Sequence, residues 1–600
     1  MFPWPTRKAG RVLAWVLALV LLIMMLAALW VGVRGAIAYK SLLRVQTGAA
    51  ESIGAIAASP ADAAPALEAL ADEAERAHQL TSDPVWSVAE SLPWLGSQLS
   101  AFSRVASSAD ELLRGSLLPL ATAAHGISLE SLRPSEGRLE VDSLRNLVGP
   151  AGEAAARAQA AAREVQDIDR TPLLGKVAGA VDQTDHLFTQ AASAIDAVSR
   201  TAQVLPAMLG SGAERNYLVL VQNNAEWRSL GGITGTAILL HVDPGGVITL
   251  RDTQTAGAVV RDLREPIVAL PSDVTDIYGT RPARYFHNLT QVPDFTIDGP
   301  IAREMYRSKT GVAVDGVLVV DPVVLSYVLQ TTGPVALPNG DTLNAANAPS
   351  ALMNGVYFRY ADPSAQDAYF AGATGAVFQA LLEGKGTAAG LISALYRAGA
   401  EHRLILWSAT ATEQAVLAGT TIAGSLPESD AHTARFGVYF NDGTGSKMSY
   451  YVTPDVSLSC GSATGNRRAA LTLRLTLTNS ATADAPTTFP EYITGGGAYG
   501  ISPGTAKVVG NIYLPEGFEL ESAEIQNAGG FSEGWLQGRR VLTFGMDLVP
   551  QASMALSVEV RSSEAVPNAE AVVTPTADPN LKPVVNTACR AVATGGASVH

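Results

Sequence analysis

Cysteine, histidine clusters and basic patches are scarce in this chain of 600 residues. Its two cysteines are too few for a cysteine-based zinc site, and they form no C-x-x-C motif. The eight histidines are scattered, and none has the H-x-x-x-H spacing of a zinc hydrolase. Dense runs of Lys and Arg are missing beyond the N-terminus, and the net charge is −14. Because phosphate binding needs clustered cations, we exclude nucleic-acid-binding proteins. The spacing of the histidines and cysteines excludes zinc hydrolases.

The two cysteines, Cys460 and Cys589, both lie in the last quarter of the chain. If this part of the chain lies outside the cytoplasm, one disulfide between them would tie the C-terminal tail to a strand. Two unpaired, buried cysteines are the alternative.

Charge is also missing from "VLAWVLALVLLIMMLAALWVGV", Val12 to Val33. At about 1.5 Å per residue this run spans roughly 33 Å as a helix, enough for a hydrocarbon core of about 30 Å. A cleaved signal peptide has a shorter apolar region and a small-residue cleavage site. Trp15 and Trp30 lie near the two ends, as interfacial anchors do. Residues 12–33 therefore predict a transmembrane helix in the lipid bilayer, after a cytoplasmic tail at residues 1–11.

The orientation of this helix is not decided by the charges on its two sides. Basic residues flank the run in nearly equal number, namely Arg7, Lys8 and Arg11 before it and Arg34, Lys40 and Arg44 after it. The preceding tail is short and basic, and long following domains translocate largely regardless of charge. We therefore predict a single-pass signal anchor in the cell membrane, with the bulk of the chain extracytoplasmic.

Residues 43–210 are rich in alanine and helical in pattern. An apolar stripe at alternating steps of four and three residues is formed by Leu95, Leu99, Phe102, Ala106, Ala109 and Leu113. Prolines divide the region into several helices. The pattern predicts a helical stalk or bundle, because a partner-binding coiled coil would need a sustained heptad, which the region lacks.

The rest of the chain predicts two further domains, so that the whole is a multidomain α+β protein. Residues 214–425 alternate strand and helix signals, as in "YLVLVQ", "TAILLHV" and "VDGVLVVD", which predicts an α/β domain with a mixed sheet. Residues 435–600 change to a period of two. In "ALTLRLTLT", Leu471, Leu473, Leu475 and Leu477 share one face. Repeated runs of this kind between Gly/Pro/Asn turns predict a C-terminal antiparallel β-sandwich.

The stretch "QNNAEWRSLGGITG", residues 222–235, is a long polar linker between two predicted strands. In open α/β sheets, ligands bind outside the carboxyl ends of strands. The candidate ligand-binding residues at such strand ends are Asn223, Glu226, Arg228, Gly231, Gly232, Arg251, Asp252 and Asp321. Arg228 offers a fork of donors for a phosphate or carboxylate, and the glycines permit close approach to a bound group. A structural Glu226–Arg228 pair, with the asparagines capping the loop, is the alternative.

"RNYLVLVQNNAEWRSLGGITGTAILLHVDPGGVITL", with "VDGVLVVDPVVLSYVLQTTGPV" downstream, resembles membrane-anchored bacterial proteins that carry domain of unknown function 4012. The resemblance covers roughly residues 85–560. It implies a membrane anchor, a stalk and an extracytoplasmic head, with no established activity. Its most distinctive part is the motif from Asn223 to Gly235.

"TAILLHVDPGGVITLRDT" is more weakly similar to the LytR-CpsA-Psr enzymes, which move glycopolymers from polyprenyl-pyrophosphate lipids onto peptidoglycan. In those enzymes arginines and aspartates hold the pyrophosphate and a Mg²⁺. By position, Arg251 and Asp252 match their Arg-Asp pair, and Arg359 and Asp367 match the start of a later arginine-rich segment. This chain continues instead with "AYFAGATGAVFQ", which has no arginine.

We therefore predict a binding or accessory protein of the cell envelope, with a cell-wall glycopolymer or a polyprenyl-linked sugar as its partner. The alternative is a LytR-CpsA-Psr-like phosphotransferase that attaches glycopolymer to peptidoglycan, so the enzyme question stays open. Only that alternative implies a cofactor, Mg²⁺, for which Asp252 is a possible ligand.

Overall fold

The computed structural model describes residues 7–58, 60–124, 137–138, 142–461, 469–526, 529–564 and 566–589. The chain divides into two compact units, which are Met1–Ser131 with Val141–Pro206, and Leu132–Glu140 with Ala207–His600. Residues 1–6 of the predicted tail and residues 590–600 of the predicted sandwich domain lie outside the described residues. The predicted class, a multidomain α+β protein with an N-terminal apolar helix, is confirmed.

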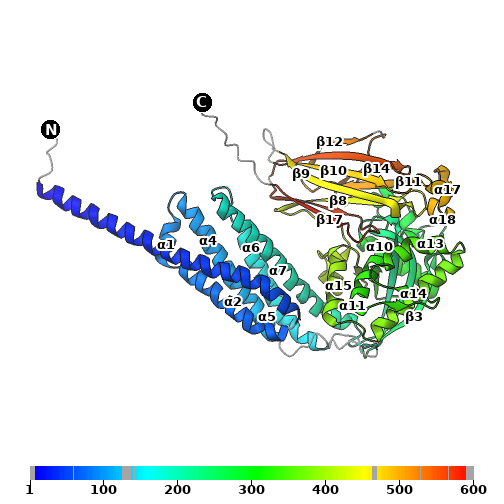
Figure 1. Cartoon of the computed structure of the whole chain (residues 1–600), viewed down its shortest axis with the longest axis horizontal. Coiled ribbons are helices and arrows are strands. Elements are labelled where there is room, and N and C mark those ends of the chain that lie inside the picture. The colour runs from blue at the N-terminus through cyan, green and yellow to red at the C-terminus, as the bar shows by residue number, and fades with distance from the viewer. Residues whose placement is uncertain are drawn as a thin grey trace. The chain divides into compact units, whose positions relative to one another are not determined.

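The first unit is built from helices (Figure 1). α1, Arg7–Ala58, is one unbroken helix that contains the predicted transmembrane run and continues well beyond it. The part Ala14–Gly48 is long and apolar enough to cross a membrane, and the large apolar side chains of residues 15–30 are exposed. The other helices are α2 (Pro60–Thr81), α3 (Pro84–Glu90), α4 (Leu95–Asp110), the π-helix η1 (Glu111–Leu117), α5 (Leu118–Ala123), the 3₁₀ turn η3 (Asp142–Leu147), α6 (Val148–Gln166) and α7 (Gly175–Met208).

Alanine makes many of the contacts between these helices. Ala38 of α1, Ala77 of α2 and Ala106 of α4 are fully buried and pack together. Their small side chains let the helix backbones approach closely but bury little area each. The predicted stripe on α4 is buried at Ala106 and Ala109 and exposed at Leu95, where α4 begins.

The second unit starts with a five-stranded mixed sheet in the order β3-β2-β1-β4-β7. β1 is antiparallel to β2 and parallel to β4, and the other neighbours are antiparallel. Its central strands are near-continuous apolar runs because helices cover them. The strands are β1 (Arg215–Arg228), β2 (Gly231–Val242), β3 (Ile248–Thr255), β4 (Gly316–Val320) and β7 (Ile405–Ser408).

Helices lie between the strands of this sheet along the chain. α11 begins at Pro322, where a missing amide hydrogen costs nothing, and Asp321 caps it by accepting from the Val323 and Val324 amides. The main helices are α8 (Ala256–Val259), α9 (Ser272–Tyr278), α10 (Phe295–Thr310), α11 (Pro322–Thr332), α12 (Ala348–Ser350), η6 (Ala351–Gly355), α13 (Val356–Arg359), α14 (Pro363–Leu382), α15 (Ala388–Ala400) and α16 (Ala411–Leu417). A small hairpin joins β5 (Val335–Ala336) to β6 (Thr342–Leu343).

Two further sheets form the predicted sandwich, with orders β12-β15-β10-β9 and β13-β14-β11-β8-β16-β17. The alternation in β10 is confirmed, because its four leucines from Leu471 to Leu477 are buried in the shared core. One pair departs from the antiparallel prediction, since β16 runs parallel to β8. The strands are β8 (Thr433–Asp442), β9 (Val452–Gly461), β10 (Ala469–Asn479), β11 (Ala506–Tyr513), β12 (Glu519–Ile525), β13 (Ser532–Leu536), β14 (Arg539–Leu548), β15 (Ser553–Ser562), β16 (Asn568–Val573) and β17 (Val584–Ala588).

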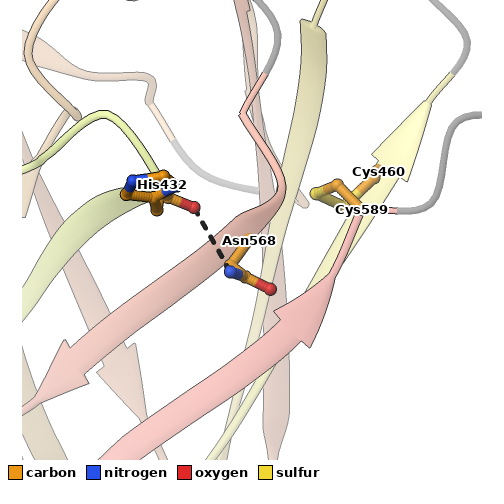
Figure 2. Close-up of a disulfide and its surroundings, with 4 residues drawn as sticks. All are labelled: His432, Cys460, Asn568 and Cys589. Atoms are coloured by element: carbon orange, nitrogen blue, oxygen red, sulfur yellow. Dashed lines mark hydrogen bonds between the residues drawn. A yellow bond between two sulfur atoms is a disulfide. The ribbon is translucent and has the colours of Figure 1, made fainter. Parts of the chain in front are cut away.

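A disulfide joins Cys460 of β9 to Cys589, the residue after β17 (Figure 2). Each of these strands ends the order of its own sheet, so the bond links the two sheets at one side of the sandwich. Nearby, the Asn568 side-chain amide donates to the His432 carbonyl oxygen at 3.3 Å. Of the two alternatives for the cysteines, the structure contains the disulfide.

Candidate functional site

The stretch 222–235 is not a long loop. β1 runs on to Arg228, β2 starts at Gly231, and only Ser229 and Leu230 lie between them. The register jumps between Asn223, which faces Ile233, and Trp227, so the intervening residues form a bulge in β1. The polar residues therefore belong to a strand with a bulge, a device that redirects side chains locally.

Glycine is required at both positions that pair with the end of β1. Gly231 has a φ of 131°, a conformation that residues with a Cβ rarely adopt. At Gly232, a Cβ would lie 2.3 Å from the Asn223 carbonyl oxygen. The two glycines thus serve close backbone packing across the bulge.

Glu226 and Arg228 lie in a buried ionic cluster with Lys447. The Arg228 guanidinium donates to Glu226 Oε1 at 3.1 Å, and the Lys447 ammonium donates to Glu226 Oε2 at 2.5 Å. Arg228 also donates to Asn288 Oδ1 at 2.9 Å and to the Trp227 carbonyl oxygen at 2.7 Å. The structural pair, the alternative to ligand binding, is the arrangement observed.

The charges in this cluster change the protonation of their neighbours. Burial alone would raise the pKa of Glu226, but Lys447 and Arg228 outweigh it and lower the pKa of this carboxyl. Burial, and then the negative charge of Glu226, raise the pKa of Asp442 to about 6. Burial and the positive charge of Arg228 lower the pKa of His287 to about 4. The cluster therefore keeps Glu226 charged and His287 neutral at pH 7.

This end of β1 is inserted into the sandwich. Trp227 is fully buried in the sandwich core and stacks on Phe440 with ring centres 5.1 Å apart. The Ser229 hydroxyl accepts from the Asn441 side-chain amide at 2.9 Å, and the Ser229 carbonyl accepts from the Thr574 hydroxyl at 2.9 Å. The motif thus joins the α/β part to the sandwich.

A second buried ion pair makes the same connection from β4. Asp321 Oδ2 accepts from Arg403 at 2.7 Å and from the Asn224 side-chain amide at 3.1 Å. Arg403 and Asn224 also donate to the carbonyl oxygens of Thr576 and Pro575, just after β16. Asp321 therefore caps α11 through Oδ1 and joins the α/β part to the sandwich through Oδ2, so that both carboxylate oxygens accept hydrogen bonds from protein groups.

The remaining predicted residues do not join these clusters. Arg251 is exposed on β3, a strand at the edge of the sheet, and Arg359 is exposed on α13, where it pairs with Asp341. Asp252 accepts from the Thr253 amide and the Gln254 side chain. Asp367 is exposed on α14. Arg228 is thus buried, whereas Arg251 and Arg359 are exposed on separate elements.

Asp252, the candidate magnesium ligand, does not belong to a cluster of metal-binding side chains among the described residues. Within them, no three His, Cys, Asp or Glu side chains gather as metal ligands. Asp252, the candidate ligand, is engaged by its own strand. A pocket of about 450 Å³ lies on the sandwich and is lined by Val509, Gly529, Gly530, Phe531, Ser532, Thr543, Phe544 and Gly545. It contains none of the predicted site residues.

The structure does gather aromatic side chains at an exposed place that the sequence did not single out. We call Phe358, Phe489, Tyr492 and Tyr499 the aromatic surface. Phe358 packs edge-on to Phe489 with ring centres 5.3 Å apart, and Tyr492 stacks on the buried Tyr357 at 5.1 Å. About half of the Phe358 and Tyr492 side chains is exposed. α13 supplies Phe358, and the segment between β10 and β11 supplies the other three.

Tyr499 is the most exposed member, at 84%. It lies in "GGGAYG", residues 495–500, and has a φ of 56°, which is unusual for a residue with a side chain. Such strain persists only where the surroundings impose it, and it concentrates at functional sites. The glycine-rich turn therefore holds this ring outward.

The buried ionic cluster supports the aromatic surface from below. The Lys447 ammonium lies 5.5 Å from the centre of the Tyr492 ring and 6.0 Å from that of Tyr357. Asn223 donates to the Tyr357 hydroxyl at 2.5 Å. The motif residues thus orient the aromatic rings through Lys447 and Tyr357. Lys447 belongs to the stretch "GTGSK", whose residue spacing does not indicate a buried ion pair. The stretch "FPEYITGGGAYG" does carry a signal for the aromatic surface, namely its aromatic residues and glycines.

A fully buried carboxyl, that of Asp298 on α10, lies outside these clusters. Burial, and then the nearby Asp294, raise the pKa of Asp298 well above its usual range. Asp294 in turn accepts from the Gln537 side chain of the sandwich at 2.7 Å. Burial therefore favours the protonated form of Asp298.

Comparison with known families supports the first resemblance. Residues 212–357 match the family described as "Protein of unknown function (DUF4012)". The matched segment begins just before β1 and ends at Tyr357, so it contains the motif and the ring beneath Tyr492. No curated protein matches the chain. The resemblance to LytR-CpsA-Psr enzymes is not confirmed.

Replacing Lys447 tests the buried cluster. Lys447→Met leaves Glu226 with one cationic partner fewer in a buried place, so we expect the free energy of unfolding to fall by about 3–5 kcal/mol. Lys507→Met is the control, because Lys507 forms an exposed pair with Asp547 and its loss should cost about 0–1 kcal/mol. Urea unfolding of the full chain in detergent measures both. Equal losses in the two variants would contradict a stabilising role of the cluster.

Asp298→Asn should change how stability depends on pH. The folded wild-type chain keeps a proton on Asp298 that the unfolded chain releases above its ordinary pKa, so wild-type stability falls as the pH rises. The Asp298→Asn variant has no titratable group at this position, so its stability does not fall with pH for this reason. Its stability relative to wild type should therefore rise with pH once the pH exceeds the ordinary aspartate pKa of about 3.9, by up to about 1.4 kcal/mol per pH unit. Thermal unfolding at several pH values measures this difference, with the exposed Asp455→Asn as control; a constant difference would disprove it.

Proposed function

We propose that this chain, which carries a DUF4012 domain behind one apolar N-terminal helix, is a single-pass protein of the cell envelope with its second unit outside the cell membrane. The disulfide between Cys460 and Cys589 supports this side, because disulfides persist in oxidising compartments. The length of the chain that follows the helix also favours translocation. A head on that side faces the polymers of the envelope.

The proposed activity is binding of an envelope glycopolymer on the aromatic surface. The observation that carries this proposal is the exposure of the Phe358, Tyr492 and Tyr499 side chains. A sugar ring presents polarised C–H groups on one face and hydroxyls at its edge. The C–H groups suit the negative face of an aromatic ring, and the tyrosine hydroxyls suit the sugar edge. Exposed apolar patches of this kind mark interaction sites.

Binding is favoured over glycopolymer transfer by the state of the arginines. A phosphotransferase needs cationic groups directed at the pyrophosphate. Arg228 is buried and donates to three protein groups, and Arg359 pairs with Asp341. The aromatic surface, in contrast, exposes about half of the Phe358 and Tyr492 side chains and most of Tyr499.

Alanine variants of the aromatic surface test the binding role. We expect Tyr492→Ala and Tyr499→Ala each to weaken binding of the full chain to purified wall glycopolymer about tenfold, or about 1.4 kcal/mol, since each removes one stacking ring. Trp535→Ala is the control, because Trp535 is similarly exposed on β13. Isothermal titration in detergent measures the affinities. A parallel titration with a polyprenyl-pyrophosphate-linked sugar separates the two sources of sugar, and binding that depends on pyrophosphate and Mg²⁺ but not on these tyrosines would favour the transferase.

The proposed location has its own test. Protease added to intact cells whose walls have been removed should digest the second unit and leave a membrane-bound N-terminal fragment. Thiol alkylation without reductant should leave Cys460 and Cys589 unmodified, because both are in the disulfide. A protected chain with two reactive thiols would place the head in the cytoplasm.

A further inference from the structure

The helical unit begins to pack around α1 directly after the apolar run. Gly35 lies so close to the Trp86 ring of α3 that a Cβ there would be 3.4 Å from it. Arg34 is held in place by the Leu80 carbonyl at 2.9 Å and by Asp83 at 3.0 Å. Its guanidinium also lies 5.1 Å from the Trp30 ring. The bundle therefore starts within one helical turn of the predicted membrane boundary.

Helix α3 and the turn that joins it to α4 lie at this same end and expose large apolar side chains. Val88 is 70% exposed, Trp94 66% and Leu92 50%. Trp94 has a φ of 66°, and at Gly96 a Cβ would overlap the Glu90 carbonyl oxygen. The backbone of the turn is thus tightly folded in a way that directs these side chains away from the bundle core.

The depth of this turn follows from the packing of α4 along α1. Phe102 of α4 contacts Trp86, with ring centres 6.1 Å apart, and Ala106 packs with Ala38 of α1. The two helices therefore run in the same direction. Going back seven residues from Phe102 to Leu95 moves about 10 Å towards the membrane. This places the turn beside the last part of the apolar run.

A second turn adds to the same end of the bundle. Gln98 of α4 donates to the Pro172 carbonyl at 2.7 Å and accepts from the Leu174 amide at 3.0 Å. Leu174, in the turn between α6 and α7, is also exposed. The Glu90 carboxylate is turned inward, since it accepts from Trp86 Nε1 and from the Ser103 hydroxyl. Apolar groups face outward while a nearby carboxylate is satisfied within the protein.

We propose that these two turns rest in the surface of the bilayer that α1 crosses. The membrane-proximal surface consists of Val85, Val88, Leu92, Trp94, Leu95 and Leu174. Tryptophan is enriched at membrane–water interfaces, and apolar side chains inserted there gain free energy by leaving water. The lipid is the occupant because the surface is continuous with the end of the membrane run. This inference rests on the proposed anchor, and it adds a second contact that fixes the tilt of the bundle against the membrane.

Depth measurements on the full chain test the membrane-proximal surface. In vesicles of phosphatidylcholine and phosphatidylglycerol, one cysteine is introduced at a time and labelled with an environment-sensitive fluorophore. The native cysteines do not react because they form the disulfide. Val88→Cys and Trp94→Cys should be quenched severalfold more by lipids with a nitroxide near the headgroup than Ser107→Cys. Ser107 is the matched control, since it is exposed on α4 but about 18 Å further along than Leu95.

The possible outcomes separate this proposal from the anchor itself. A label at Leu21→Cys, within the apolar run, should be quenched by nitroxides deep in the acyl chains. If Leu21→Cys reports lipid while Val88→Cys and Trp94→Cys report water, the anchor stands and the membrane-proximal surface does not exist. If Leu21→Cys also reports water, the anchor fails. Labels at 88 and 94 shielded from both water and lipid quenchers would indicate a second copy of the chain and overturn the proposal.

Discussion

The buried carboxylate of Glu226 between Arg228 and Lys447 is the interaction on which the second unit depends. A charge removed from water is tolerated only when partners of opposite sign and further hydrogen bonds compensate its lost hydration. Here the partners come from different parts of the chain, Arg228 from β1 and Lys447 from the sandwich. The α/β part and the sandwich therefore must meet for either to be satisfied.

This requirement explains why a strand end carries so many polar residues. Trp227 brings apolar area into the sandwich core, and Asn224 and Ser229 satisfy backbone and side-chain groups on the far side. The Asp321–Arg403 pair repeats the arrangement a short distance away. Polar contacts of this kind fix the geometry of the joint, and removal of one partner leaves a buried group without compensation. These contacts also fix the rings of the aromatic surface relative to one another, because Phe358 comes from the α/β part and the other three rings come from the sandwich.

Patterns that depend on local chain chemistry were predictable from the sequence, and contacts between distant segments were not. The period of two in β10, the proline and glycine at the ends of α11, and the uncharged run in α1 each reflect a neighbourhood of a few residues. Lys447 follows Glu226 by more than two hundred positions, so no spacing rule could pair them. The same holds for the aromatic surface, where Phe358 meets Phe489 only after folding. The polar stretch at 222–235 stands out in the sequence, but its burial could not be predicted. In the structure Arg228 is buried and pairs with Glu226, the alternative to ligand binding.

One further consequence concerns α1. Its 52 residues include no proline, and they pass from the apolar run into the alanine-lined bundle without a break. A helix of this kind bends only gently, so it behaves as a stiff shaft rather than a flexible tether. A rotation or displacement of the apolar part of α1 would therefore also move the part of α1 that packs in the bundle.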